Sequence, residues 1–282
     1  MPDVINTLLP VALGFIMFAV GVTLVPADFM RLFEQPRAVL AGLFGQLVVL
    51  PVAAWLLAIG WRLSPEMAVG LVILGACPGG ASSALITHLA RGSAALSVTL
   101  TAITSLVALV SMPLVVQFAL QHFLATDQAV TFSVARLVRG VFIITTVPVA
   151  LGMLLRARAP QWTARHEQAI GRVATTLFVL IVVATFVSQR GPLLENLPTV
   201  GPAAFTLNLA VMLAGVGLAW ACRLGRKDSI AIAAECGLQN AGLGIFIALS
   251  VLKMPALAIP SVVYALLMNV GAVGLIYVAR RS

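Results

Sequence analysis

A succession of long apolar segments with short connections constrains this chain more than any other feature of its sequence. Nine stretches each have the length of a membrane-spanning helix, because about 20 apolar residues are needed to cross about 30 Å of hydrocarbon. They cover residues 5–25, 38–60, 68–90, 94–120, 136–156, 168–188, 203–223, 229–252 and 257–279. The connections, such as Pro26-Ala27-Asp28, are too short for a soluble domain. The sequence therefore predicts an all-α polytopic membrane protein with nine transmembrane helices.

Composition supports this interpretation and excludes other classes. Only 9% of the 282 residues are charged and 61% are hydrophobic, whereas a soluble domain of this length needs far more charge on its surface. The net charge of +8 comes from basic residues in the gaps between apolar stretches, so it is expected to orient the chain in a bilayer and not to bind nucleic acid. The cysteines Cys77, Cys222 and Cys236 have no spacing typical of a disulfide framework or a metal site.

The basic residues also predict the orientation of the chain in the cell (inner) membrane. One group follows the odd-numbered segments or lies near the C-terminus: Arg31, Arg37, Arg91, Arg156, Arg158, Arg165, Arg172, Arg223, Arg226, Lys227, Arg280 and Arg281. The smaller group on the opposite side is Arg62, Arg136, Arg139, Arg190 and Lys253. By the positive-inside rule we expect the N-terminus outside and the C-terminus in the cytoplasm. That orientation requires an odd number of spans.

Two of the nine segments are interrupted near their centres. Segment 3 is broken at residues 77–83, a run that contains Pro78, Gly79 and Gly80, and segment 8 is broken at residues 235–242. Both breaks are expected near the bilayer midplane, since proline removes an amide donor and glycine lowers the cost of unwinding. Segments 3 and 8 are five spans apart and therefore cross in opposite directions. Paired discontinuous helices in two inverted repeats are typical of the binding site of a secondary transporter.

Glu235 is the one acidic side chain placed deep in an apolar segment. An ionised carboxylate at the midplane costs about 2.5–3.5 kcal/mol on insertion scales, so it must be neutralised. No Lys or Arg lies at the same depth in any segment, which leaves a proton or a bound cation as its partner.

Oxygen donors lie close to Glu235 in the sequence or near the other break. They are the side chains of Ser83, Ser97, Thr101, Gln239 and Asn240, together with the main-chain carbonyls that unwinding would free at Cys236 and Leu238. Oxygen-only ligation suits a small alkali cation better than a transition metal. The sequence thus predicts a cation site at the two breaks.

The second halves of both interrupted segments are predicted to present free amides, at Ala81-Ser82-Ser83 and at Asn240-Ala241. The positive ends of two helices that point inward favour an anionic group of a substrate. A cation at one set of helix ends and an anion at the other is expected of a cation-coupled symporter of organic anions.

Several motifs recur together along the chain. They are Gly45-Gln46 followed by Pro51, the run from Gly75 to Ser83, Ala90-Arg91-Gly92 with Leu96-Ser97-Val98, and the stretch ECGLQNAGL from Glu235 to Leu243. Together they resemble the bile acid:sodium symporter family, in particular its bacterial members. The last stretch is the most specific, because it resembles the E-x-G-x-Q-N signature of that family in the eighth span. The likeness covers essentially the whole chain from residue 5.

The resemblance implies one transporter domain in two parts and two sodium sites. A panel domain would hold residues 1–60 and 136–188, and a core domain with the crossed interrupted helices would hold residues 68–120 and 203–279. The first sodium site would match Ser83, Ala84, Ser97, Thr101 and Glu235, and the second Gln46, Glu235, Cys236, Leu238 and Gln239. Together with the helix ends at the two breaks, the resemblance points to Ser82, Ser83, Asn240, Met268 and Asn269 as the substrate-binding residues.

Two positions depart from the family pattern. The family usually has Asn where this chain has Ala84, so the first sodium site loses an amide oxygen. Met268 stands where some bacterial relatives have a His near the substrate. The expected substrate is a small carboxylate or sulfonate, a class that in the family runs from sterol conjugates to pyruvate-like acids. The sequence does not predict an oligomeric state, and a monomer is compatible with it.

Two other functions are considered. Arsenite efflux permeases have a related architecture and depend on a cysteine in a broken helix, and Cys77 and Cys236 both flank breaks. Such an efflux permease, or one coupled to protons, is the alternative to a sodium symporter. An intramembrane enzyme is disfavoured because the sequence has no HExxH, no GxSxG and no second midplane acid beside Glu235.

Overall fold

The computed structural model describes residues 2–80, 82–124 and 134–281, which are largely helical. Ala81, one of the amides predicted to face the substrate, lies outside the described residues. The α-helices in chain order are α1 (Pro2–Thr23), α2 (Pro26–Glu34), α3 (Pro36–Phe44), α4 (Leu50–Gly60), α5 (Pro65–Ala76), α6 (Ser83–Leu89), α7 (Ala94–Phe123), α8 (Val134–Val141), α9 (Val147–Arg158), α10 (Pro160–Ser188), α11 (Arg190–Ala221), α12 (Arg226–Gly237), α13 (Ala241–Phe246) and α14 (Ile259–Arg281). Shorter turns continue some of them: the π-helical turns η1 (Gly45–Val49), η2 (Phe142–Thr146) and η3 (Ile247–Val251), and the 3-10 turn η4 (Pro255–Ala258).

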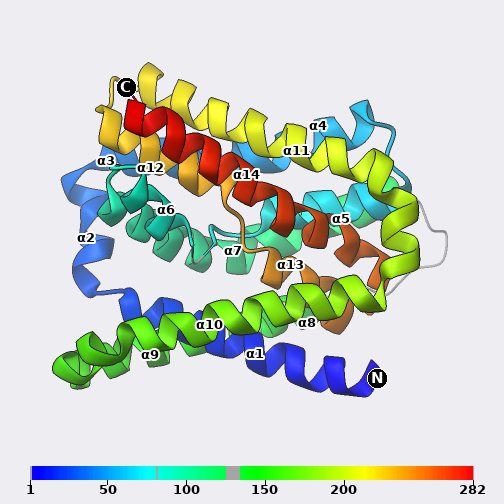
Figure 1. Ribbon diagram of the computed structural model, residues 1–282, viewed down its shortest axis with the longest axis horizontal. Helices are drawn as coiled ribbons and strands as arrows, with labels where there is room; N and C mark the ends of the chain where they lie inside the picture. Colours follow the sequence, from blue (N-terminus) through cyan, green and yellow to red (C-terminus); the bar gives the residue numbers. More distant parts are fainter. Residues whose placement is uncertain (1, 81, 125–133, 282) are drawn as a thin grey trace.

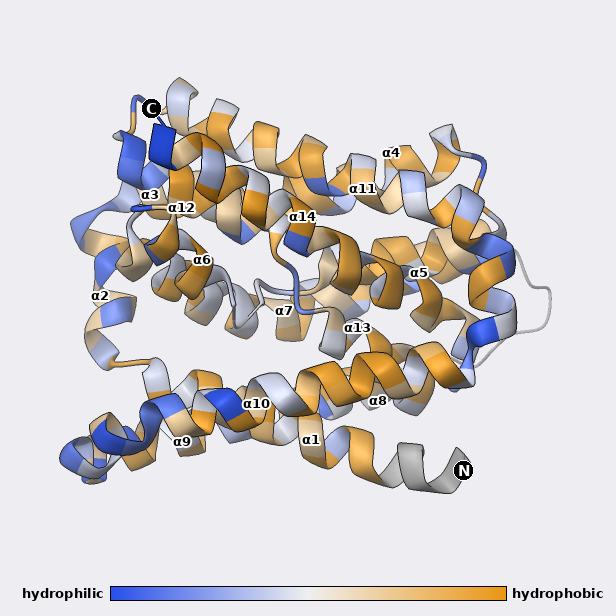
Figure 2. Ribbon diagram, viewed as in Figure 1, coloured by the Kyte–Doolittle hydropathy of each residue, from blue (hydrophilic) through white to orange (hydrophobic). Residues whose placement is uncertain are grey.

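Six helices of the described chain are long and apolar enough to cross a membrane. They are Pro36–Gly60, Ala94–Phe123, Leu137–Arg158, Pro160–Ser188, Arg190–Ala221 and Pro255–Arg281. A seventh span results if α1 and α2, which meet at an angle of 64°, are taken together. The long helices are apolar along their length, with hydrophilic residues gathered toward the two ends (Figure 2). The part of the chain that the structure describes is therefore a helical membrane protein, as the apolar segments predict.

Two stretches that the sequence analysis placed in connections are helical. Pro26-Ala27-Asp28 opens α2, because proline is well suited to the first turn of a helix. The Asp28 carboxylate accepts a hydrogen bond from the main-chain N–H of Val25 at 2.8 Å and so caps that turn. The residues before 203 belong to α11, which contains both Pro198 and Pro202. Membrane helices tolerate internal proline where neighbouring groups satisfy the freed carbonyls.

The helices form two groups, one above the other in Figure 1. In the first group, which we call the lower group, α1 packs against α9 and α10 and contacts η2. In the second, the upper group, α7 packs against α5 and α6, and α11 packs against α12 and α14. Helix α13 contacts members of both groups, and α2 leads from the end of α1 to α7.

The second apolar segment, α3–η1–α4, makes its main contacts with the upper group. It packs against α5, α7, α11 and α12. The resemblance had assigned this segment to the panel together with α1. Its contacts are instead mainly with the helices of the upper group, and at Gly45 it closely approaches an interrupted segment: a Cβ there would lie 2.8 Å from Cys236 Sγ.

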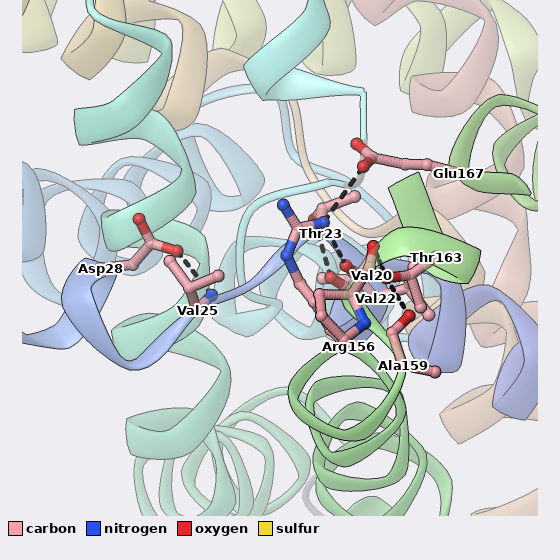
Figure 3. Close-up of polar contacts among 10 residues, drawn as sticks. Val20, Val22, Thr23, Val25, Asp28, Arg156, Ala159, Thr163 and Glu167 are labelled. Carbon is pink, nitrogen blue, oxygen red and sulfur yellow. Dashed lines mark hydrogen bonds and ion pairs between the residues drawn. The ribbon is translucent and has the colours of Figure 1, made fainter. Parts of the chain in front are cut away.

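Arg156 ties together three helix ends of the lower group (Figure 3). Its Nη1 donates to the carbonyl oxygen of Val22 in the last turn of α1, at 2.8 Å, and to Glu167 Oε2 on α10, at 3.1 Å. A partly exposed ion pair contributes only about 0–1 kcal/mol. The carbonyl contact therefore matters more, because it satisfies an acceptor that the end of α1 leaves without a helical partner.

Four basic residues end helices in the left-handed conformation. They are Arg62, Arg91, Arg223 and Lys253, with φ between 48° and 61°. Glycine is usual at this position, but a basic side chain there is favoured by the negative end of the helix dipole. Arg62 and Arg223 are about 160 residues apart in the sequence, and so are Arg91 and Lys253. Equal spacing of two such helix ends is what two structural repeats would produce.

Candidate functional site

The two interruptions meet near the centre of the molecule (Figure 1). Helix α5 ends at Ala76 and α6 begins at Ser83, so the first break matches the predicted run. The second break is shorter than the sequence analysis proposed. Helix α12 continues through Glu235 to Gly237, and α13 begins at Ala241.

The unwound segments pair with each other. Gly79 and Gln239 form an isolated antiparallel bridge. Gly80 N–H donates to the Leu238 carbonyl at 2.7 Å, and Asn240 N–H donates to the Pro78 carbonyl at 3.0 Å. Each break thus satisfies main-chain groups of the other, which an apolar interior would otherwise leave unpaired at a cost of several kcal/mol each.

A cluster of hydroxyl groups surrounds the carboxylate of Glu235, which is fully buried. Ser97 Oγ donates to Glu235 Oε2 at 2.8 Å, and Thr101 Oγ1 donates to Glu235 Oε1 at 2.6 Å. Ser83 Oγ lies 3.2 Å from Ser97 Oγ and 3.4 Å from Thr101 Oγ1. Residues from α6, α7 and α12, remote in sequence, therefore place five side-chain oxygens together.

Gly79 has no room for a side chain beside this cluster. A Cβ built on Gly79 would overlap Glu235 Oε1, and a Cβ on Gly80 would lie 2.9 Å from the Gln239 carbonyl oxygen. Glycine is therefore required here for close approach of the first break to the carboxylate.

Next to this cluster, Gln46 and Gln239 face each other across the breaks. Gln46 Nε2 donates to Gln239 Oε1 at 2.8 Å, and Gln239 Nε2 lies 3.3 Å from Gln46 Oε1. Gln239 Nε2 also reaches the carbonyl oxygens of Cys236, at 2.8 Å, and Glu235, at 3.2 Å. Of the second set of predicted ligands, Gln46, Glu235, Cys236 and Gln239 are thus brought together around one amide pair, whereas the Leu238 carbonyl accepts from Gly80 N–H.

The π-helical turn η1 positions Gln46. Pro51 follows it as the second residue of α4, after Leu50, and the ring of Pro51 would clash with the Leu47 carbonyl in a regular helix. The wider turn avoids this clash and adds one residue to the register of the helix. The proline in the motif Gly45-Gln46…Pro51 therefore has a local structural role beside Gln46.

At the breaks, fewer main-chain N–H and C=O groups lack a hydrogen-bond partner than the sequence predicts. The Leu238 and Cys236 carbonyls already accept hydrogen bonds, as described above. The amides of Ser83 and Ala241 donate to Gly80, at 3.0 Å, and to Gln239, at 2.9 Å. The bridge between the breaks occupies the Leu238 carbonyl, the Gln239 side chain occupies the Cys236 carbonyl, and the two amides bond within their own break. Hydropathy predicts none of these contacts. Each carbonyl keeps a second lone pair for a cation.

The predicted substrate residues are not all gathered in one place. Ser83 belongs to the Glu235 cluster, whereas Ser82 is exposed. Asn240 is buried, its Oδ1 caps α13 by accepting from Leu243 N–H at 3.0 Å, and its Nδ2 lies 3.6 Å from the sulfur of Met17 on α1. Asn240 thus lies where the two groups of helices meet.

The remaining two substrate candidates lie on α14. Met268 is buried, and Asn269 is exposed with its amide bonded to the carbonyl of Ala265 on its own helix, at 2.7 Å. No described contact links either side chain to the Glu235 cluster. Two surface grooves of about 570 and 320 Å³ lie elsewhere, between α3 and α11 and along α10, α11 and α14.

Asn208 and Tyr264 are two polar residues near the second break that the sequence does not predict. Both are fully buried, and both donate to the carbonyl oxygen of Gly237 at the end of α12. Their only signal in the sequence is a polar group within a long apolar stretch.

Comparisons with known proteins agree with these features. Residues 10–196 match the model of the sodium bile acid symporter family. The uncharacterized sodium-dependent transporter YocS of Bacillus subtilis (strain 168) is 31% identical over 265 residues, which is 94% of this chain and 80% of that protein. The probable chloroplastic sodium/metabolite cotransporter BASS2 of Oryza sativa subsp. japonica is 30% identical over 269 residues, covering 94% of this chain and 62% of that protein.

A vertebrate relative completes the comparison. The ileal sodium/bile acid cotransporter of Homo sapiens is 28% identical over 254 residues, covering 85% of this chain and 68% of that protein. These relatives are transporters and not enzymes, and the family resemblance inferred from the motifs is confirmed. This chain, a multi-pass membrane protein, belongs to the sodium bile acid symporter family.

Proposed function

We propose that this protein is a sodium-coupled symporter of a small organic anion that works by alternating access in the cell (inner) membrane. The observation that carries the proposal is the burial of the Glu235 carboxylate among hydroxyl groups of Ser97 and Thr101. Within the described ranges no Lys, Arg or His contacts it. A buried carboxylate needs a counter-charge, and oxygen donors on every side suit an alkali cation.

The proposal includes two overlapping sodium sites, and the positions of these oxygen atoms support them. The first takes the hydroxyls of Ser83, Ser97 and Thr101 with the Glu235 carboxylate. The second takes the amide oxygens of Gln46 and Gln239 with main-chain carbonyls of the second break, including those of Cys236 and Leu238. In both, hydrogen bonds that the side chains now make to each other are exchanged for bonds to the ion. The bacterial relative is named as a sodium-dependent transporter and the plant relative as a sodium/metabolite cotransporter, which supports sodium over a proton.

The substrate is proposed to be a carboxylate or a sulfonate bound between the two groups of helices. Asn240 supports this place, because it contacts Met17 of α1 from the edge of the second break. We propose nine spans, with the interrupted pairs α5–α6 and α12–α13 each crossing once in two inverted repeats. The lower group would then be the panel, and residues 36–60 would belong to the core with residues 68–120 and 203–279.

An arsenite-type permease is less well supported by the positions of the thiols. Cys77 and Cys236 are both buried, and Cys77 Sγ bonds to the carbonyl of Ile73 on its own helix, at 3.4 Å. Both thiols are packed against neighbouring helices: a Cβ on Gly45 would lie 2.8 Å from Cys236 Sγ, and a Cβ on Gly244 would lie 3.6 Å from Cys77 Sγ.

A thermal-shift experiment on the purified protein tests sodium coupling. Sodium at about 100 times its dissociation constant should stabilise the protein by about 2.7 kcal/mol, and the same concentration of potassium should not. Glu235→Ala should abolish this stabilisation and sodium-driven uptake, because the variant lacks the charge that holds the ion. Glu167→Ala, which removes a partly exposed carboxylate of the lower group, serves as the control and should keep both. Full sodium-driven uptake by the Glu235→Ala variant would contradict the proposal.

A further inference from the structure

The carbonyl oxygen of Gly237 accepts hydrogen bonds from two side chains of other helices. Asn208 Nδ2 on α11 donates to it at 2.7 Å, and the Tyr264 hydroxyl on α14 donates to it at 2.9 Å. Asn208 Nδ2 also lies 3.2 Å from the Tyr264 hydroxyl oxygen. Both side chains are fully buried. Three helices are therefore joined at the main-chain atom where α12 ends.

Two glycines make the space that Asn208 occupies. A Cβ on Gly271 of α14 would overlap Asn208 Oδ1, and a Cβ on Gly237 would collide with the Met212 side chain and lie 3.5 Å from Asn208 Nδ2. Asn208 Oδ1 has no hydrogen-bond partner among the described residues. An unpaired buried acceptor lowers stability, so apolar packing alone would favour a different side chain here. What an apolar side chain could not provide here is the hydrogen bond from the amide to the Gly237 carbonyl.

The same arrangement recurs at the other break. Gln46 Nε2 donates to the carbonyl oxygen of Cys77, where α5 ends, at 3.2 Å. The donor and acceptor are 31 residues apart there and 29 residues apart for Asn208 and Gly237. In both cases, a side-chain amide of the preceding apolar segment therefore donates to the main-chain carbonyl where the first half of the interrupted helix ends. Gln46 also belongs to the proposed second sodium site, whereas Asn208 contacts none of the proposed sodium ligands except through Gly237.

We propose that Asn208 and Tyr264 are positioning residues for sodium binding. Glu235 and Gln239 lie two residues before and two residues after Gly237, so holding its carbonyl fixes the orientation of both side chains. A site whose ligands are already oriented binds its ion more tightly, because less conformational freedom is lost on binding. This inference rests on the proposed function, and its experiment separates the two.

The test is a sodium titration of thermal stability on the full-length purified protein. Tyr264→Phe removes one hydrogen bond to Gly237 and leaves the ring. It should raise the sodium dissociation constant about three- to tenfold, the range expected from one hydrogen bond, with little change in the maximal rate of uptake at saturating sodium. Asn208→Leu replaces the amide with a side chain of similar size that has no hydrogen-bond donor, and it should raise the sodium dissociation constant at least as much. Ser261→Ala is the control on the same helix, since Ser261 is buried and its hydroxyl has no partner in the described chain.

The readout is the change that sodium causes, not the melting temperature itself. A Tyr264→Phe variant that melts lower in potassium but binds sodium as the wild type does would overturn the positioning role. Should Asn208→Leu fail to fold, Tyr264→Phe decides alone. A wild-type protein that sodium does not stabilise would instead overturn the proposed function.

Discussion

Ala84 is the position where a single residue most affects the expected stoichiometry. It follows Ser83 at the start of α6 and is half-buried. An amide oxygen lost from a cation site costs about 1–3 kcal/mol if nothing replaces it. The exposed position of Ser82 gives no direct substitute. We therefore expect the first sodium site to be weak and the Hill coefficient for sodium to be nearer one than two.

Ala84→Asn should restore the missing oxygen and raise the sodium affinity or the Hill coefficient, measured in sodium-dependent uptake. Ala84→Leu is the matched control, because it fills similar space without an oxygen and should not raise either value. Steep two-sodium dependence in the wild type, unchanged by Ala84→Asn, would show that another group already supplies the ligand.

The π-helical turn η1 is the element that aims Gln46 at Gln239. Pro51→Ala removes the ring that prevents a regular helix, so the turn should revert to α-helical register and rotate Gln46 by roughly 100°. We expect a weaker sodium affinity by about tenfold, which corresponds to about 1.4 kcal/mol. Pro113→Ala is the control, because Pro113 lies inside the continuous helix α7 without such a turn. Unchanged sodium binding in Pro51→Ala would show that sodium binding does not depend on the π-helical turn η1.

The proposed division of the whole molecule predicts which cross-links stop transport. In a Cys222→Ser background, cysteines at Trp55 and Phe118, whose rings stack at 4.7 Å, would join α4 to α7 within the core. Cysteines at Gly140 and Val251 would join the panel to the core, since a Cβ on Gly140 lies 3.3 Å from Val251 Cγ2. We expect the first cross-link to preserve uptake and the second to block it.

Uptake after thiol-specific cross-linking, with reversal by a reducing agent, measures both cases. A block by the Trp55–Phe118 cross-link would place residues 36–60 with the panel after all. Full uptake with Gly140 and Val251 joined would mean that the two groups of helices do not move against each other at this end.

The sequence alone determined that the chain is a helical membrane protein, and it singled out the buried carboxylate at its centre. Long apolar stretches dictate helices because lipid leaves no other way to satisfy a single segment's main chain. Pro78 and the adjoining glycines predicted the first break where α5 ends, and Glu235 could be singled out because its charge has no local partner. These inferences depend only on each residue's own solvation and backbone preferences. The motif around Glu235 also identified the family, which the comparisons confirm.

Only the tertiary structure decided which surfaces meet. Hydropathy does not tell that α3 and α4 pack with the interrupted helices, that the breaks pair as a bridge, or that Asn208 and Tyr264 converge on Gly237. In a membrane the apolar faces of all helices resemble the lipid, so burial of apolar surface does not select their partners. Close approach at glycines and hydrogen bonds between distant residues make that selection, and both depend on three-dimensional contacts that no local pattern contains.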